Sequence, residues 1–499
     1  MPSSLSSEAK PKSSIDIPNS TFLGKGRTRL ILIPILGVCL LIGIAIVLGR
    51  PNEIPYEVTT KISSKTPSLA DQNVYVVDIH SHTSETEFLK DDGNEPVPAQ
   101  SARYLKFGYQ TIFHTPHSDY TTDPARWQSE HDYEENGNWG LSRYLGEEVR
   151  VEPGPKWQVV NGLKNNDHLG VIGQNAFIAD SLPFKAVCER AHTSGGLVSL
   201  NHPGPAPAMW EAGYWTQPAI HDKLDAIEVF NGQLMHFLPV DSLGTYFMAV
   251  NYGKWGLKVA AVGGTDSHKS EDDPQVATLV VAPDGSERSI VEAIRRRNTY
   301  AVFKLLDLRM YCAQLGQTIY SGDVNLKIET SRPVEKIELV REGRRAQLWE
   351  NASSAEFTGT ITENTTYLWR IFDGDGRAYS SAIWYEPNPI QLPDLVIDTE
   401  GAKRRGKTLS LAVRNDGRAT AKDVVVEAWA GYAGEGGELL ASRSYPEISA
   451  GNRLPIKLIL KSEPTGPVFV RVDPESYTLQ DDDAIAELNE RNNSAIIGE

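Results

Sequence analysis

The chain is poor in cysteine and has no excess of basic residues. Its 499 residues include three cysteines, Cys39, Cys188 and Cys312, without a CxxC spacing. This excludes a disulfide scaffold and a thiolate zinc site. Lys and Arg number 49 against 65 Asp and Glu, a net charge of −16, so we expect no nucleic-acid partner. The length is typical of about three or four domains, and the 40% of hydrophobic residues is enough for ordinary packed cores.

Residues 30–48 form a run without a charge, LILIPILGVCLLIGIAIVL. As a helix this run would be about 28 Å long, close to the thickness of a hydrocarbon core. A cleaved secretory signal has a shorter apolar region and a small-residue cleavage site, which the following GRPNE does not provide. The run therefore predicts an uncleaved transmembrane anchor. The alternative is a lipoprotein signal, because LGVC resembles a lipobox, but Val38 is larger than that motif requires.

The charges that flank this run predict its orientation. Residues 1–29 carry five Lys and Arg against two Asp and Glu, a net charge of +3. The positive-inside rule keeps such a segment in the cytoplasm. We therefore expect a cytoplasmic tail over 1–29 and a single-pass protein of the cell membrane, with everything after residue 50 periplasmic or extracellular. Residues 49–72 contain several Pro, Ser and Thr and predict a linker.

Histidines and carboxylates recur at the ends of strand-like segments between residues 73 and 302. The β-branched and apolar runs that predict buried strands are 74–77, 110–115, 197–200, 226–230 and 258–262. The polar clusters that end or separate them are DIHSH (78–82), PHSD (116–119), GEEV (146–149), DHLG (167–170), NHP (201–203), AIEVF (226–230) and GGTDSH (263–268). Helices are predicted at 98–106 and 183–192. This alternation indicates an α/β barrel, whose functional side chains gather where the strands end.

The composition of these clusters predicts a metal site. Six of the 11 histidines lie in them. Two histidines at i and i+2 after a strand, as in HSH, point to the same side and can share a metal. Imidazole and carboxylate ligands without thiolates suit Zn, Mn or Fe with open positions for water or substrate.

The set of motifs resembles the PHP (polymerase and histidinol phosphatase) superfamily, and NHP, IEVFNG and GTDSH are most similar to the CehA/McbA-type metallohydrolases. The resemblance covers about residues 73–302. It implies a distorted (β/α)7 barrel that holds two or three divalent metal ions. The ligands that it implies are His80, His82, Asp92, His117, Glu148, His168, His202, Asp266 and His268, and Asp266 is the implied catalytic residue.

Two of the implied acidic ligands have alternatives. Asp92 precedes a glycine, which matches the family's Asp-Gly, whereas Glu87 matches by its spacing, five residues after the second histidine. The ambiguity arises because residues 85–91 form a longer stretch than is usual in the family. Glu147 is a neighbour that could take the place of Glu148.

The second motif departs from the family pattern. The family has Thr-Asp-His, whereas this chain has Thr115-Pro116-His117. Loss of that carboxylate could weaken one metal position or alter the contacts around it. Asp119 is a nearby residue that could replace it.

Further polar and aromatic residues have less specific interpretations. His114 lies within a predicted strand and is expected to pack or to contact a ligand, and Glu228 could orient a ligand or form a buried pair. The aromatic residues that could line a substrate mouth or cover the barrel's rim are Trp210, Tyr214 and Trp215. The histidines that we expect not to bind metal are His131, His192, His221 and His236.

The pattern changes after residue 302. Residues 303–389 alternate β-forming segments with turn residues and predict a small β-sandwich. Residues 390–499 open with PDLVI, contain VRNDG and close with ELNERNN, which resembles a CARDB module, an immunoglobulin-like domain of bacterial surface proteins. Asp473 and residues 481–483 could bind Ca²⁺, but we expect a solvated acidic face. We assign this module no chemistry and expect it to serve as a spacer or as a surface for a partner.

The sequence thus predicts a membrane-anchored, extracytoplasmic metal-dependent hydrolase. A metal-bound hydroxide would attack a phosphoester or a carboxyl or carbamate ester of a small molecule. The alternative is a non-catalytic surface binding or adhesion protein with a residual metal site. The near-complete set of ligands favours the enzyme.

Overall fold

The computed structural model describes residues 73–89, 91–118, 123–151, 168–179, 182–203, 223–237, 241–251, 257–271, 273–474 and 485–498. The predicted cytoplasmic tail, anchor and linker (1–29, 30–48 and 49–72) lie outside these residues. Within the described ranges, no helix combines the length and the apolar character needed to cross a membrane.

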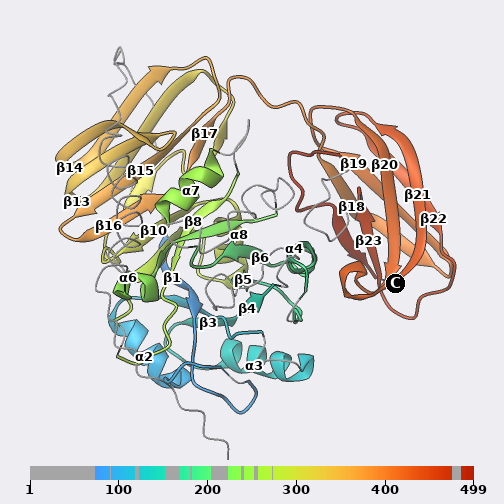
Figure 1. The fold of residues 1–499 in the computed structure, drawn as a ribbon, viewed down its shortest axis with the longest axis horizontal. Helices are drawn as coiled ribbons and strands as arrows, with labels where there is room; N and C mark the ends of the chain where they lie inside the picture. Colours follow the sequence, from blue (N-terminus) through green and yellow to red (C-terminus); the bar gives the residue numbers. More distant parts are fainter. Residues whose placement is uncertain are drawn as a thin grey trace, which may run out of the picture. The chain divides into compact units, whose positions relative to one another are not determined.

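A 12-stranded sheet forms the larger part of the fold (Figure 1). Its strands are β1 (Val74–Ser81), β2 (Thr111–His114), β3 (Ser142–Leu145), β9 (Val276–Val281), β10 (Thr299–Phe303), β11 (Met310–Cys312), β12 (Thr318–Ile319), β13 (Asp323–Arg341), β14 (Arg344–Thr360), β15 (Thr365–Asp373), β16 (Gly376–Ser380) and β17 (Ile383–Tyr385). The main path runs β11-β13-β15-β16-β10-β9-β1-β2-β3. β1, β2 and β3 are parallel, whereas β9 and β10 continue the sheet beyond β1 in antiparallel pairing.

A five-stranded sheet carries the other polar clusters. Its strands are β4 (Glu147–Arg150), β5 (His168–Ile172), β6 (Leu197–Leu200), β7 (Ala226–Asn231) and β8 (Ala260–Gly264), in that order. β4, β5 and β6 pair antiparallel, and β6, β7 and β8 pair parallel. Nearly every described side chain of these strands is buried, as expected of continuous apolar runs covered on both faces.

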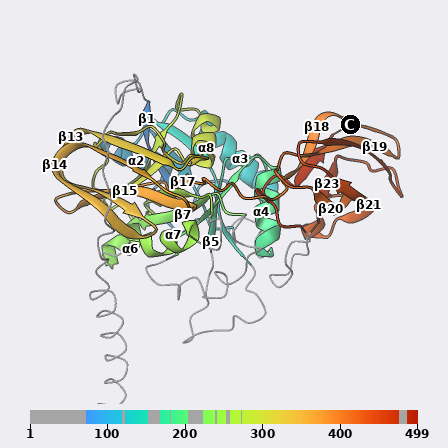
Figure 2. The same ribbon diagram turned by 90° about the horizontal axis from the view of Figure 1, so that it is seen from above.

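Helices cover the sheets, and two of them lie where the sequence predicted helices, at 98–106 and 183–192. They are α2 (Val97–Lys106), α3 (Pro124–Asn136), α4 (Phe184–Thr193), α6 (Gly232–Phe237), α7 (Leu243–Val250) and α8 (Glu287–Arg295). α3 begins at Pro124 because the Asp123 side chain accepts a hydrogen bond from the Ala125 backbone N–H. Figure 2 shows α6 and α7 beside β7, which both helices contact.

The prediction of a (β/α)7 barrel is wrong. Among the described residues, more lie in strands than in helices, and the strands form separate sheets that do not close. A barrel of that kind needs parallel neighbours joined by helical crossovers. Here β9 and β10 pair antiparallel beside β1 and lead the sheet outward to β16, so β1 and β8 are not joined as neighbouring strands.

The expected separate sandwich over 303–389 is corrected as well. β10 pairs with β16, so strands from both sides of residue 303 belong to one sheet. They also share apolar cores. One core joins Val76 and Ile112 to Leu326 and Trp369, and another joins Val149 on β4 to residues of β13, β15 and β16. Residues 303–385 are therefore a continuation of the body that carries the polar clusters.

The last segment of the chain has a core of its own. It forms a three-stranded sheet, β18-β19-β22, and a four-stranded sheet, β21-β20-β23-β24. The strands are β18 (Leu395–Arg405), β19 (Thr408–Asn415), β20 (Ala421–Ala430), β21 (Glu438–Ile448), β22 (Arg453–Ile459), β23 (Val468–Val472) and β24 (Ser494–Ile497). Their inward apolar side chains form one cluster whose described members all lie between residues 395 and 497.

Candidate metal centre

The ends of β1 and β8 meet and bring two of the motifs together. His80 lies on β1 and His82 directly follows it, on either side of Ser81, which forms a parallel bridge to Ser267. The backbone N–H of Asp266 donates to His80 O over 2.8 Å, and that of His82 donates to Ser267 O over 3.1 Å. The HSH and TDSH segments are therefore held side by side by backbone hydrogen bonds.

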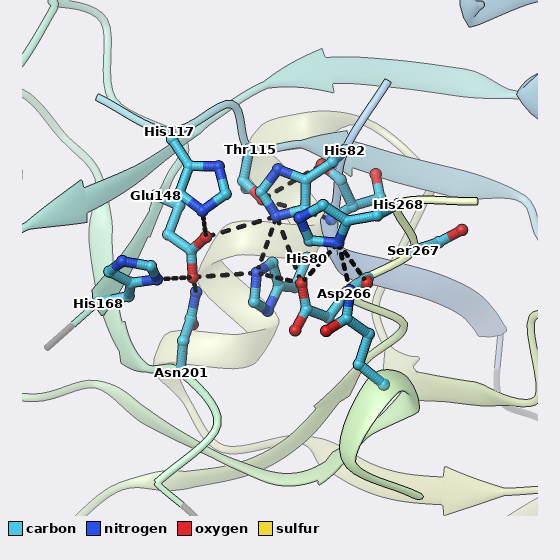
Figure 3. Close-up of polar contacts among 12 residues, drawn as sticks. His80, His82, Thr115, His117, Glu148, His168, Asn201, Asp266, Ser267 and His268 are labelled. Carbon is cyan, nitrogen blue, oxygen red and sulfur yellow. Dashed lines mark hydrogen bonds and ion pairs between the residues drawn. The ribbon is translucent and has the colours of Figure 1, made fainter. Parts of the chain in front are cut away.

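Glu148 lies at the middle of the candidate centre (Figure 3). Its Oε1 lies 3.1 Å from His80 Nε2, His168 Nδ1 and His202 Nε2, and accepts a hydrogen bond of 3.0 Å from the Asn201 amide. Its Oε2 lies 3.0 Å from His117 Nε2 and 3.4 Å from His82 Nε2. One buried carboxylate thus separates two sets of imidazoles.

The converging side chains form groups that could hold metal ions. In each group the donor atoms lie within 4.8 Å of one another. The groups around Glu148 are His82–Asp92–His117–His268, His80–Glu148–His202, His80–His82–Asp266 and His117–Glu148–His168. These groups share members, so the structure offers several adjacent cation positions built from imidazole and carboxylate donors.

Each ligand predicted from the sequence lies in this cluster. The alternatives lie elsewhere. Glu87 is exposed and belongs to none of the donor groups among the described residues. Glu147 points away from Glu148, because successive strand residues face opposite sides, and its carboxylate accepts a 3.0 Å hydrogen bond from the Ile178 N–H.

Glu228 and Asn231 orient residues of the centre from β7. Glu228 Oε1 lies 3.1 Å from His80 Nδ1, which leaves Nε2 of that ring directed at Glu148. Glu228 Oε2 accepts hydrogen bonds from the His202 backbone N–H and from Asn231. The Asn231 amide also donates to Asp266 Oδ2 over 3.1 Å. Of the two roles predicted for Glu228, the geometry supports orientation of a ligand.

Asp91 is a site residue that the sequence reasoning missed. It is buried, its Oδ1 lies 3.2 Å from His82 Nδ1, and its Oδ2 accepts a 2.9 Å hydrogen bond from the Thr83 N–H. His114 Nε2 lies 3.0 Å from the same Oδ2. The signal in the sequence was the adjacent pair Asp91-Asp92, in which we considered one member alone.

A buried chain of charges continues behind Asp91. His114 Nδ1 lies 2.9 Å from Glu134 Oε1 on α3, and Glu134 is paired with the buried Arg143 on β3. Arg143 also donates to Gln100 Oε1 over 2.9 Å, and the Gln100 amide donates to His82 O over 2.7 Å. This network of ion pairs and hydrogen bonds fixes Asp91 and the backbone of His82 from the side opposite the cluster.

The change to proline in the second motif is accommodated by the backbone. The Glu148 N–H donates to Pro116 O over 3.0 Å, and the Ser118 N–H donates to Glu148 O over 2.9 Å. His117 is therefore fixed beside Glu148. Its Nδ1 lies 3.5 Å from Asp92 Oδ1, so an acidic group near this ring comes from the loop after β1. Asp119 lies outside the described residues.

Two site residues have unusual backbone conformations. His202 has φ +28° and Asp266 has φ +49°. Non-glycine residues rarely adopt positive φ, and such strain concentrates at functional sites. In both residues the strained backbone directs the side chain toward Glu148 or the HSH segment.

The close packing of imidazoles and carboxylates shifts the pKa values of these side chains strongly. Burial by itself would lower the pKa of His80, but Glu148, Asp266 and Glu228 raise it well above its usual value. Burial opposes ionisation of Glu148, yet the imidazoles of His168 and His80 lower its pKa well below the usual range. His168 differs, because burial outweighs its carboxylate neighbour and lowers its pKa. Carboxylates held ionised among imidazoles are prepared to receive cations.

The other residues named in the sequence analysis either lie away from the centre or lie outside the described residues. The His131 ring lies 5.3 Å from the Trp127 ring on α3, and His192 Nε2 lies 2.8 Å from Asp225 Oδ2, so neither histidine contacts the centre. Trp210, Tyr214, Trp215 and His221 lie outside the described residues, as do the side chain of His236 and residues 481–483.

Comparisons with known proteins do not indicate a function, so the functional argument depends on the geometry of the site. No family model matches the sequence, and no curated protein matches it. The human OSCAR ligand-binding domain is 16% identical over 38% of this chain and 96% of its own, with a TM-score of 0.17. Fibronectin(III)-like modules of Clostridium thermocellum CbhA are 16% identical over 38% of this chain and 93% of their own, with a TM-score of 0.15. Bacteroides uniformis β-glucuronidase 3 is 13% identical over 43% of this chain and 27% of its own, with a TM-score of 0.17.

Proposed function

We propose that the chain is a metal-dependent hydrolase whose centre is built around Glu148. The observation that carries this proposal is the position of one buried carboxylate between two sets of imidazoles, with three nitrogens 3.1 Å from Oε1 and two others near Oε2. Because Glu148 belongs to two of the donor groups, it could contribute ligand atoms to ions in two adjacent positions. This arrangement favours two or three divalent ions.

The donor set suits Zn, Mn or Fe. All donors are imidazole nitrogens or carboxylate oxygens, and the described cysteines, Cys188 and Cys312, are buried elsewhere. His168 Nε2 is buried and has no hydrogen-bond partner among the described residues. Burial of an unsatisfied polar atom costs free energy, and an ion on this nitrogen would remove that cost.

The metal ions and the residues of the chain would have different roles in the reaction. Bound divalent ions supply Lewis-acid polarisation of a carbonyl or phosphoryl oxygen and acidify a nearby water. Asp266 Oδ1 lies 3.5 Å from His80 Nε2 and 3.4 Å from His82 Nε2, while Asn231 holds its Oδ2. A carboxylate anchored in this way could hold an ion together with His80 and His82, or take a proton from a water molecule. The substrate would be a small-molecule phosphoester or a carboxyl or carbamate ester.

The test is metal analysis combined with hydrolysis by the purified full chain. We expect two or more metal ions per chain, and metal-dependent cleavage of 4-nitrophenyl acetate or bis(4-nitrophenyl) phosphate. His80→Ala and Asp266→Ala should lose metal and activity together, whereas His131→Ala should keep both. Metal without hydrolysis would favour a binding protein, and absence of metal would exclude the proposal.

We further propose that this activity lies outside the cytoplasm, on a chain anchored by residues 30–48. The support is the uncharged run and the net charge of +3 before it. A reporter fused after residue 60 should be digested by protease added to intact spheroplasts. Protection of that reporter would contradict the orientation.

A further inference from the structure

A further group of donor atoms lies outside the cluster around Glu148. A ring nitrogen of His114 and one carboxylate oxygen each of Glu130 and Glu134 lie within 4.8 Å of one another. All three residues are buried, and none of them belongs to the four donor groups around Glu148. An imidazole together with two carboxylates is a donor set that suits a divalent transition-metal ion.

The fold brings these donors together from one helix and one strand. Glu130 and Glu134 are four residues apart on α3, so their side chains leave the same face of the helix. His114 is the last residue of β2, and its Nδ1 lies 2.9 Å from Glu134 Oε1. Donors that share one ion at about 2.1 Å lie roughly 3 Å apart, so this spacing suits two ligands of one ion.

The other nitrogen of the His114 ring is already engaged. Nε2 lies 3.0 Å from Asp91 Oδ2 and 3.1 Å from Thr83 Oγ1. A hydrogen on Nε2 that is donated to the Asp91 carboxylate leaves a lone pair on Nδ1, on the side of Glu134. A metal-bound histidine typically donates its second ring nitrogen to a carboxylate in this way.

Glu130 is the member of the group that has an unsatisfied oxygen. The residue is fully buried, and its Oε2 accepts a 2.6 Å hydrogen bond from the Thr86 hydroxyl. Its Oε1 is buried and has no hydrogen-bond partner among the described residues. A buried carboxylate oxygen without a partner costs free energy, and an ion bound to this oxygen would offset that cost.

The charges around the group have an excess of negative charge. Arg143 is paired with Glu134, which leaves the carboxylate of Glu130 and, behind His114, that of Asp91. With His114 neutral, three carboxylates face one guanidinium. A divalent ion would balance the excess of two negative charges, whereas a single proton would balance half of it.

We propose that His114, Glu130 and Glu134 bind a divalent transition-metal ion that is separate from the ions of the candidate centre. Because all three donors are buried, this ion has a structural role: it ties α3 to the end of β2 and, through Asp91, to the loop after β1. The inference goes beyond the proposed function and does not depend on it, because this group shares no residue with the groups around Glu148.

The experiment titrates the chelator-treated full chain with Mn²⁺ and counts the bound ions from the electron paramagnetic resonance signal of free Mn²⁺. Glu130→Gln and Glu130→Leu, which keep the approximate size of the buried side chain, should each bind one ion fewer per chain than the wild type. Both should still hydrolyse the substrates that the wild type hydrolyses. The matched control is Glu135→Gln, which alters an exposed glutamate of the same helix and should leave the number of ions unchanged.

Hydrogen exchange tests the location of the ion. An ion that binds the folded helix and not the opened one slows the exchange of its amides. Mn²⁺ should therefore slow exchange in α3 about tenfold more in the wild type and in Glu135→Gln than in Glu130→Leu.

Three results separate this inference from the proposed function. The wild-type number of bound ions in both Glu130 variants would overturn the inference and leave the proposed function intact. Loss of hydrolysis by Glu130→Gln together with more than one ion would show that Glu130 serves the candidate centre, which would also overturn a separate site. A wild-type chain that hydrolyses nothing, but holds one ion that both variants lack, would support the inference and refute the proposed function.

Discussion

At the scale of single residues, the candidate centre depends on which of two neighbouring side chains points inward. Glu147 and Glu148 are adjacent on β4, yet one accepts a backbone hydrogen bond from Ile178 and the other contacts five imidazoles. Burial raises the pKa of Glu147 well above its usual value, whereas imidazoles lower that of Glu148. The pKa of the same residue type is therefore shifted in opposite directions one position apart.

This contrast provides a matched pair of substitutions. Glu148→Gln should lower the metal content by at least one ion per chain and abolish activity, because it removes the shared anionic donor. Glu147→Gln should leave metal content unchanged and shift stability by less than about 1 kcal/mol, because an amide resembles a protonated carboxyl. Metal analysis and thermal unfolding would check both, and equal metal loss in the two variants would refute the central role of Glu148.

The loop after β1 offers a second set of isosteric changes. Asp91→Asn should weaken metal binding by about 10–100-fold, because it removes the negative charge beside His82 and replaces one of the two acceptor oxygens by an amide group. Asp92→Asn should weaken it as well, because this carboxylate belongs to a donor group with His117 and His268. Glu87→Gln should have no effect. Titration of the metal-free variants with Zn²⁺ measures all three, and a large effect of Glu87→Gln would show that the loop is assigned wrongly.

The buried histidine behind the centre predicts a pH dependence of stability in the metal-free protein. Burial opposes protonation of His114, but its contacts with Asp91 and Glu134 raise the pKa to about 9 from 6.5. A raised pKa contributes stability that is complete below pH 6.5 and is lost as pH rises toward 9. Glu134, with its pKa lowered to about 2, stays ionised throughout and adds no slope.

We therefore expect the chelator-treated protein to lose roughly 1–3 kcal/mol between pH 6.5 and 9 from this group. His114→Gln should flatten the profile, although His80 and His82 contribute in the same direction. Metal affinity should change in the opposite sense and increase over the same range, because ions displace protons from imidazoles. Denaturant unfolding at several pH values tests the prediction, and a metal-free protein that gains stability up to pH 9 would contradict it.

At the scale of secondary structure, the centre requires two strand ends to approach closely. Gly264 ends β8 next to His80, and a Cβ at this position would lie 2.5 Å from His80 Cβ and 2.6 Å from Glu228 Oε1. Any larger residue would displace His80 or the carboxylate that orients it. The glycine is therefore a geometric condition for the cluster.

Gly264→Ala should destabilise the protein by about 1–3 kcal/mol and weaken metal binding, because the close contact forces a backbone shift. The matched control is Gly244→Ala on α7, where no atom lies within 4 Å of the added Cβ. This control should keep metal binding and gain up to about 1 kcal/mol of stability. Calorimetry of metal binding and thermal unfolding would measure both. Undisturbed metal binding by Gly264→Ala would mean that the strand ends are less constrained than the structure indicates.

At the scale of the whole molecule, the apolar cores determine which part of the chain can be removed without unfolding the rest. The cluster of the final strands contains described residues from 395 to 497 alone, whereas residues on both sides of position 303 share two cores. Removing the last module divides no apolar core among the described residues, but it separates several ion pairs. Among them are Arg491 to Asp225 and Arg471 to Glu189, and Asp225 would keep His192 as a partner.

A chain ending at residue 390 should fold, bind the same number of metal ions and unfold within roughly 2–6 °C of the full chain. A chain ending at residue 302 should not fold, because it exposes β10 along the edge that pairs with β16 and divides two cores. Circular dichroism and metal analysis of both truncated chains would test this. Loss of metal from the 390-residue chain would show that the last module supports the centre.

The sequence by itself determined the features that depend on neighbours along the chain. It located the helix at 183–192, found as Phe184–Thr193, and the strands that end in HSH, NHP and TDSH, because the periodicity of apolar residues is local. It also identified ligand candidates such as His202 and Asp266. Tertiary structure alone decided how strands pair, because pairing joins residues far apart and is not encoded in any one segment. For this reason the open sheets, the continuation of β10 into β16, and the role of Asp91 behind His82 emerged only in three dimensions.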